Sequence, residues 1–236
     1  MLEALPSMDS DPVERRLAAI LNADVAGYSR LMADDENATI RIVTAYREQI
    51  ELQIRQVRGR LVDFTGDNFL AEFSSPTEAV RCAIEIQQVL RALNANLSTE
   101  RKMQFRMGIH LGEVRAQGER LFGTGINVAA RLQGLAKPGE LCISKKVFEE
   151  VRGNLDFRFE DLGEHEVKNI PEPVHVYAVE VPSEQVATDR SVTRYRRRLA
   201  VLATLLVLVV AAAVTWQSSQ LRLMTFWTQS VAVATP

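Results

Sequence analysis

Residues 59–73 read GRLVDFTGDNFLAEF, a stretch in which apolar and polar side chains alternate along two arms. The apolar positions of the two arms are Leu61, Phe64, Phe69 and Phe73. Between the arms stands Gly66-Asp67, a dipeptide that suits the tight turn of a β-hairpin. The stretch therefore predicts two antiparallel strands joined by a short turn.

Strands and helices alternate on both sides of this hairpin. Before it, LAAILNADV (17–25) is a short apolar run typical of a buried strand, and residues 29–57 repeat Ile and Val at helical spacing. After it, residues 75–93 begin with a Ser-Pro helix start, and MQFRMGIHLGEVRA (103–116) predicts two strands that pivot near Gly112. The pattern ends with short helices within 126–136 and after ELCIS (140–144), and with strands near 157–159 and 174–179.

The order strand, helix, hairpin, helix, strand is that of a split βαβ unit. It predicts an α+β fold, a ferredoxin-like antiparallel sheet with helices on one face. The opposite face of that sheet then needs a cover.

The composition describes a globular chain with an uneven charge. Of 236 residues, 47% are hydrophobic and 25% are charged, which excludes a disordered or collagen-like protein. The net charge is −2, with −6 over residues 1–181 against +3 over residues 182–198, so nucleic acid is not an expected partner. Two distant cysteines, Cys82 and Cys142, predict neither a disulfide framework nor a zinc site, as in a reducing compartment.

Residues 199–216 read LAVLATLLVLVVAAAVTW, eighteen residues without a charge. A helix of this length spans most of a bilayer core, so we expect one C-terminal transmembrane helix; a buried core helix would need a surrounding domain that 217–236 are too few to form. The basic flank RYRRR (194–198) precedes the span, which predicts a single-pass protein of the inner or plasma membrane with its N-terminal part in the cytoplasm.

The expected domain organisation follows from these features. It is a mobile leader (1–13), a globular domain (14–181), a basic juxtamembrane linker (182–198), the transmembrane helix (199–216) and a short extracytoplasmic tail (217–236).

Two carboxylates are expected at one edge of the sheet. Asp24 ends the first strand and Asp67 lies at the tip of the hairpin predicted to pair beside it. Such a pair suits Mg²⁺, which prefers a few carboxylate oxygens, water and substrate phosphate, although an Asp in a turn is also ordinary turn chemistry. Gly27 and Tyr28 follow at the start of the next helix, where the backbone can approach an anion closely.

A third cluster, GTGINVAAR (123–131), places Asn127 and Arg131 four residues apart and so on one helical face. An amide and a guanidinium aimed together can orient a ribose and neutralise charge on phosphoryl oxygens. The alternative is that Asn127 and Arg131 simply form a solvent-exposed helix face with no role in binding.

In combination, these motifs resemble the catalytic domain of class III nucleotide cyclases over residues 16–181. The matching stretches are ADVAGYS, FTGDNFLAEF, FRMGIHLGEV and GINVAARL, in the family's order, and the tail EDLGEHEVKNIPEPVHVYAV is also similar. The first motif departs mildly, with Asn22 where Phe is frequent.

The resemblance implies a membrane-anchored adenylate cyclase that converts ATP to 3′,5′-cyclic AMP and pyrophosphate. Asp24 and Asp67 would hold two metal ions per site, Mg²⁺ or Mn²⁺, while Asn127 positions the ribose and Arg131 stabilises the α-phosphate. It also implies a head-to-tail homodimer, in which the metal aspartates of one chain meet the Asn and Arg of its partner. That partner would cover the open sheet face.

The resemblance leaves the base open. The two base-reading positions carry Asp63 and Arg120, and both are atypical. If the donor and the acceptor are exchanged between the two positions, Arg120 can donate to N1 of adenine and Asp63 can accept from its exocyclic amine. The same two side chains can also satisfy the hydrogen-bonding groups of guanine. Bacterial relatives of this architecture favour ATP. The alternatives are a guanylate cyclase, a diverged domain that binds nucleotide with low activity, and a membrane-tethered interaction module.

The remaining candidates receive structural roles. His110 is expected to be a satisfied core histidine, and His165 and His175 lack ligand spacing. No GxxxxGK[ST] phosphate loop is present in the sequence.

Overall fold

A computed structural model of the chain describes residues 14–168 and 170–181. The chain divides into the units Met1–Pro182 and Ser183–Pro236, and all described residues lie in the first. The predicted leader, linker, transmembrane helix and tail fall outside the described residues. Within the described ranges, no helix is long and apolar enough to cross a bilayer.

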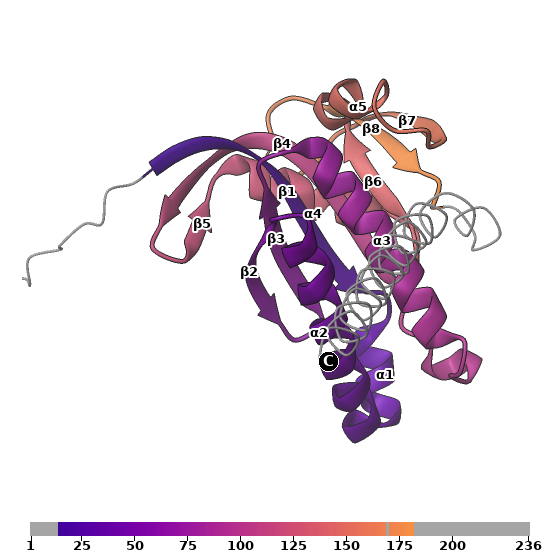
Figure 1. Cartoon of the computed structure of the whole chain (residues 1–236). Coiled ribbons are helices and arrows are strands. Elements are labelled where there is room, and N and C mark those ends of the chain that lie inside the picture. The colour runs from indigo at the N-terminus through magenta and orange to yellow at the C-terminus, as the bar shows by residue number, and fades with distance from the viewer. Residues whose placement is uncertain (1–13, 169, 182–236) are drawn as a thin grey trace, which may run out of the picture. The chain divides into compact units, whose positions relative to one another are not determined.

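The described chain forms an eight-stranded sheet in the order β2-β3-β1-β4-β6-β8-β7, with β5 paired to β4 beside this path (Figure 1). All neighbouring strands are antiparallel except β4 and β6. The strands are β1 Glu14–Val25, β2 Arg60–Thr65, β3 Asn68–Phe73, β4 Phe105–Gln117, β5 Arg120–Phe122, β6 Leu141–Ser144, β7 Phe159–His165 and β8 Val174–Val179. The α+β class and the hairpin are confirmed.

Five α-helices and one 3-10 turn are described: α1 Tyr28–Asp34, α2 Glu36–Gln56, α3 Pro76–Asn94, η1 Thr99–Arg101, α4 Thr124–Leu135 and α5 Lys145–Val151. The single helix predicted over 29–57 is divided at Asp35. The backbone of Asp35 is extended, and its side chain accepts a hydrogen bond from the Ala38 N–H, so a new helix starts at this residue. Ser75 caps α3 in the same way, ahead of Pro76.

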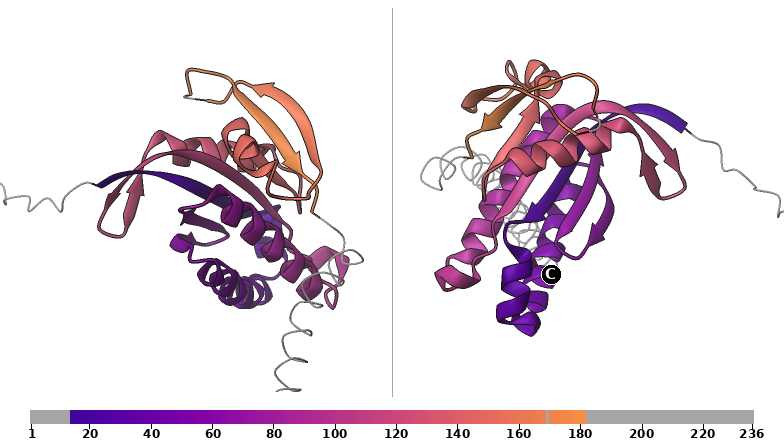
Figure 2. Two further views of the ribbon diagram at one scale, coloured as in Figure 1. Left: turned by 45° about the horizontal axis from the view of Figure 1, so that its top comes forward. Right: turned by 180° about the vertical axis from the view of Figure 1, so that it is seen from behind.

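The prediction of helices on one face only is wrong. Successive residues of β1 alternate, so that Ala19 and Leu21 enter the core beneath α2 and α3 while Ile20 packs with Ala129 of α4. Helix α4 therefore crosses the other face of the sheet (Figure 2). Amphipathic spacing shows that a helix has a buried side, but it does not say which face of a sheet receives that side.

The predicted pivot at Gly112 is also wrong, because β4 runs unbroken through it in register with Ala18. The glycine serves a close approach instead: a Cβ there would lie 3.3 Å from the Cα of Gly125 at the start of α4. At Gly108 a Cβ would lie 2.2 Å from the backbone nitrogen of Gln133. Both glycines let α4 lie directly on the sheet.

Both cysteines are free and buried, as expected of thiols in an apolar interior. Burial raises the pKa of Cys82 to about 12 and that of Cys142 to about 11, so both remain neutral and unreactive.

Candidate active site

Asp24 is the penultimate residue of β1 and lies in register with Arg106 of β4. The Arg106 guanidinium grips both carboxylate oxygens: Nε donates to Oδ1 at 2.9 Å and Nη2 to Oδ2 at 2.6 Å. The pair is partly buried: the side chain of Asp24 is 21% exposed and that of Arg106 is 32% exposed. Asp24 is thus fixed in a defined orientation by a two-pronged, charge-assisted contact.

Asp67 lies in the hairpin turn between β2 and β3, after Gly66 with φ of 62°. Burial raises the pKa of Asp67, and the negative charge of Asp24 raises it further. The backbone N–H groups of Asp67 itself and of Val25 favour the charged form of its carboxylate and partly offset this rise in its pKa. Ala23 of β1 pairs with Phe69 of β3, and Asn68 pairs with Thr65 across the hairpin turn, so the end of β1 lies beside the turn and the two carboxylates expected to converge lie at the same edge of the sheet.

Gly27 and Tyr28 lie beside this pair. Gly27 adopts a left-handed φ of 71° at the start of α1, a conformation that favours glycine. Burial and the charge of Asp67 raise the pKa of the Tyr28 hydroxyl. Helix α1 is only seven residues long, so it offers little support for the anion site predicted at its first turn.

Three polar side chains near the carboxylates had no role in the sequence prediction. The Asn68 side-chain amide, next to Asp67, donates to the Asn22 side chain at 3.3 Å and ties β3 to β1. Asn22 is only 6% exposed. Arg106 was missed as well. In each case the available signal was a polar or charged residue within an otherwise apolar strand.

Asn127 and Arg131 lie on α4 and face away from the sheet. Both are exposed, whereas Gly125, Ala129 and Leu132, which complete the helix's other side, are buried. Asp24 lies on β1, in the sheet against which the buried side of α4 packs. The amide and guanidinium thus point away from their own chain's carboxylates, toward anything that packs on the outer side of α4.

Asp63 and Arg120 are both exposed, and their segments lie near each other: the Arg60 guanidinium of β2 donates to the Glu119 carbonyl, next to Arg120, at 3.1 Å. The Thr65 hydroxyl is 3.0 Å from each oxygen of Asp63 on β2. Arg120 begins β5, opposite Gln117 of β4. In the described part of the chain no ion pair joins Asp63 to Arg120.

The donor set at Asp24 and Asp67 fits a hard divalent cation. Both donors are carboxylates, and the pKa of Asp67 is raised first by burial and then by the like charge of Asp24. Over residues 14–168 and 170–181, no group of three or more His, Cys, Asp or Glu side chains forms a closed metal cage. An open two-carboxylate site that leaves positions for water and phosphate is the arrangement typical of Mg²⁺.

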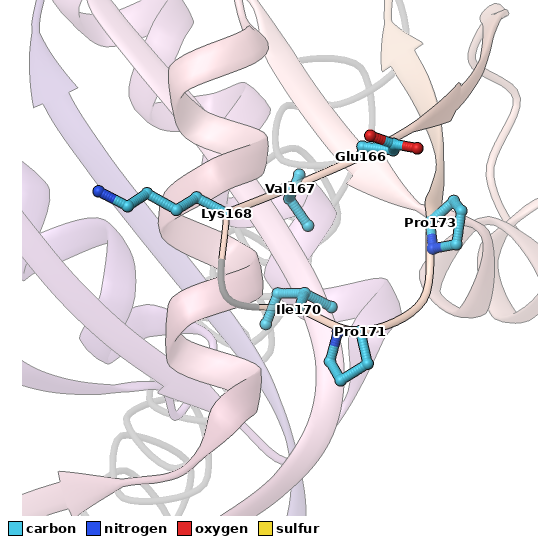
Figure 3. Close-up of a pocket in the computed structure, with 6 residues that line it drawn as sticks. All are labelled: Glu166, Val167, Lys168, Ile170, Pro171 and Pro173. Atoms are coloured by element: carbon cyan, nitrogen blue, oxygen red, sulfur yellow. The ribbon is translucent and has the colours of Figure 1, made fainter.

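The other candidates are structural. His110 is buried, with Nδ1 2.9 Å from the Ser144 hydroxyl, and burial lowers its pKa to about 4. His175 pairs with Asp161 at 2.6 Å on the surface. A surface cavity of about 460 Å³ lies on the connection between β7 and β8 (Figure 3), and none of the predicted site residues lines it.

Comparison with known proteins identifies the family of this domain. Residues 13–181 match the family model described as the adenylate and guanylate cyclase catalytic domain. A protein of Rhizobium meliloti (strain 1021) named "Putative adenylate cyclase 3" is 44% identical over 171 residues, which is 72% of this chain and 29% of that protein. An uncharacterised Mycobacterium bovis protein is 33% identical over 47% of this chain and 36% of its own length. The chain thus spans about a third of these relatives.

Solved structures show the same fold. A crystal structure titled adenylate/guanylate cyclase/hydrolase from Silicibacter pomeroyi is 40% identical, with a TM-score of 0.65 over 72% of this chain and 99% of that one. An adenylyl cyclase from P. aeruginosa, at 20% identity, matches in fold with a TM-score of 0.65 over 73% of this chain and 98% of its own. Residues 13–181, with their paired carboxylates and outward Asn and Arg, therefore belong to the adenylate and guanylate cyclase catalytic domain family.

Proposed function

We propose that the chain is an adenylate cyclase, a phosphorus-oxygen lyase that converts ATP to 3′,5′-cyclic AMP and pyrophosphate. The observation that carries the proposal is the convergence of Asp24 and Asp67 beside an Arg, together with Asn127 and Arg131 on the outer side of α4. All four side chains that the chemistry needs are present.

Each side chain has one task in this proposal. Asp24 and Asp67 hold two divalent cations, Mg²⁺ or Mn²⁺, which when bound supply the charge that activates the ribose 3′-hydroxyl and stabilises the leaving pyrophosphate. Asn127 orients the ribose so that the 3′-oxygen faces the α-phosphate. The Arg131 guanidinium donates to the α-phosphate oxygens, on which charge develops as the new P–O bond forms.

The outward direction of Asn127 and Arg131 supports a head-to-tail homodimer. Within one chain these side chains point away from the sheet that carries the carboxylates. A second copy, related by a two-fold axis, would bring its Asn and Arg to the carboxylates of the first and would create two equal sites. The face of the sheet beside α4 would be covered by the same contact.

The choice of base rests on Asp63 and Arg120. Their exposure fits a role in reading a ligand edge: the Asp63 carboxylate accepts from the exocyclic amine of adenine and the Arg120 guanidinium donates to N1. Guanine, with donors at N1 and N2 and an acceptor at O6, is the second candidate. The name of the Rhizobium relative favours ATP.

The proposed location is a membrane, with the catalytic part in the cytoplasm. It rests on the uncharged run 199–216 and the basic flank 194–198 of the sequence.

Product identification tests the proposal. The purified full-length protein is incubated with ATP or GTP and with Mg²⁺ or Mn²⁺, and the product is identified by mass. We expect the wild type to form cyclic AMP and Asp67→Ala to form none. Cyclic GMP as the only product would favour the guanylate alternative, and equal turnover by wild type and Asp67→Ala would refute the assigned chemistry.

A further inference from the structure

The contact between Arg106 and Asp24 occupies the carboxylate that the proposed function assigns to metal. The planar guanidinium meets the carboxylate with two parallel hydrogen bonds, of 2.9 Å and 2.6 Å. Both oxygens of Asp24 therefore accept an N–H, and a positive charge already lies against the carboxylate.

Arg106 is held in this position by the strand that carries it. On one side of it, the Phe105 carbonyl accepts from the buried Gln87 side chain at 2.8 Å and from the Gly139 N–H at 3.0 Å. On the other side, the Met107 N–H donates to the Glu140 carbonyl at 3.1 Å. With its backbone fixed on both sides, Arg106 faces Asp24 across two paired central strands.

The charge balance of the site explains why such a contact is present. Asp24 and Asp67 are two carboxylates at one partly buried edge of the sheet, where like charges repel each other. The Arg106 guanidinium, hydrogen-bonded to both oxygens of Asp24, carries the opposite charge. A guanidinium thus partly neutralises the two carboxylates when no metal is bound.

From this geometry we propose that Arg106 is a built-in counter-ion, which occupies Asp24 in the metal-free protein and which a divalent cation must displace in order to load the site. The inference rests on the proposed function, because it takes Asp24 and Asp67 as the metal ligands. Arg106 is a positioning residue in this scheme: it keeps Asp24 oriented and sets the affinity of the empty site for metal.

Metal binding without nucleotide tests the inference. The full-length protein is titrated with Mn²⁺ while free Mn²⁺ is followed by electron paramagnetic resonance. Arg106→Gln should bind Mn²⁺ about tenfold more tightly than the wild type, since even at the dielectric of water a positive charge a few ångströms from a divalent cation weakens binding by that order.

Arg101→Gln is the matched control. It removes the same charge, but from an ion pair with Asp35, the residue that caps α2, and Arg101 is not among the charges that act on Asp67; Mn²⁺ affinity should stay within about twofold of wild type. Asp24→Asn should abolish the tight binding. If Asp24→Asn binds Mn²⁺ like the wild type, the metal site itself is overturned. If Asp24→Asn loses Mn²⁺ binding but folded Arg106→Gln binds Mn²⁺ as the wild type does or more weakly, only the counter-ion role is overturned.

A second measurement needs no variant to bind metal. The Nε–H resonance of Arg106, assigned by its loss in Arg106→Lys, should shift when Mg²⁺ saturates the wild-type protein, because its bond to Asp24 breaks. An unchanged resonance at saturating Mg²⁺ would overturn the inference even if Arg106→Gln failed to fold.

Discussion

Gly108 on β4 supports the helix that carries Asn127 and Arg131, so Gly108→Ala should disturb the site from beneath. A Cβ at this position would lie 2.2 Å from the Gln133 nitrogen and 2.3 Å from the Ala129 oxygen, both backbone atoms of α4. An ordinary contact begins at 3.4 Å, so α4 must move by about 1.2 Å relative to the strand. No side-chain rotation can relieve the clash, because the opposing atoms belong to the helix backbone.

The expected cost has two parts. Overpacking of this kind lowers the free energy of unfolding by about 1–3 kcal/mol, which urea unfolding of the full-length protein measures. A shift of about 1 Å in the helix that carries Asn127 and Arg131 should lower turnover by up to about 100-fold, which a cyclic-nucleotide assay measures.

Gly134→Ala is the matched control on α4. A Cβ there meets nothing within 4 Å, so the substitution should raise stability by about 1 kcal/mol through helix propensity. If Gly108→Ala unfolds at the same urea concentration as the wild type and keeps full turnover, the close packing of α4 on the sheet is refuted.

Two further predictions concern buried ionisable groups and are measured by urea unfolding. Burial lowers the pKa of His110 from 6.5 to about 4, so below pH 6.5 the unfolded chain binds a proton that the folded chain does not, and stability falls as pH drops toward 4. Between about pH 7.5 and pH 5 this group should cost about 2 kcal/mol, and His110→Gln should lack that share of the loss; identical pH profiles would contradict the buried neutral state. Glu72, 9% exposed, accepts from Arg16 and Arg60 at 2.6 Å each, so Glu72→Gln should lose about 2 kcal/mol. Glu51→Gln, from exposed helix pairs, should lose less than about 0.5 kcal/mol, and equal losses in the two variants would argue against the importance of burial.

Local patterns made much of this fold predictable. Alternation around Gly66-Asp67 located a hairpin, and the Ser75-Pro76 helix start located α3, because both signals depend on neighbours in sequence. The side of the sheet occupied by α4 depends instead on the close approach allowed by Gly108 and Gly112, for which sequence periodicity carries no information. Gly112 was misjudged as a pivot for the same reason.

The site was predictable to a similar extent. Asp24 and Asp67 could be matched because each ends or connects a recognisable strand. The partner of Asp24 could not be found, because Arg106 is 82 residues away and the pair depends on the exact register of β1 against β4. The direction of Asn127 and Arg131, away from their own sheet, likewise appears only when the buried side of α4 is known.

In the proposed dimer each site takes its carboxylates from one chain and its Asn and Arg from the other, and mixed chains can test this arrangement. Asp24→Ala and Arg131→Ala, each nearly inactive alone, are combined in equal amounts and allowed to exchange subunits. Half of the dimers would then be mixed, each with one intact site of two, so activity should recover to about a quarter of the wild-type value. No recovery, with mixed dimers demonstrated by tandem affinity purification, would contradict the shared site.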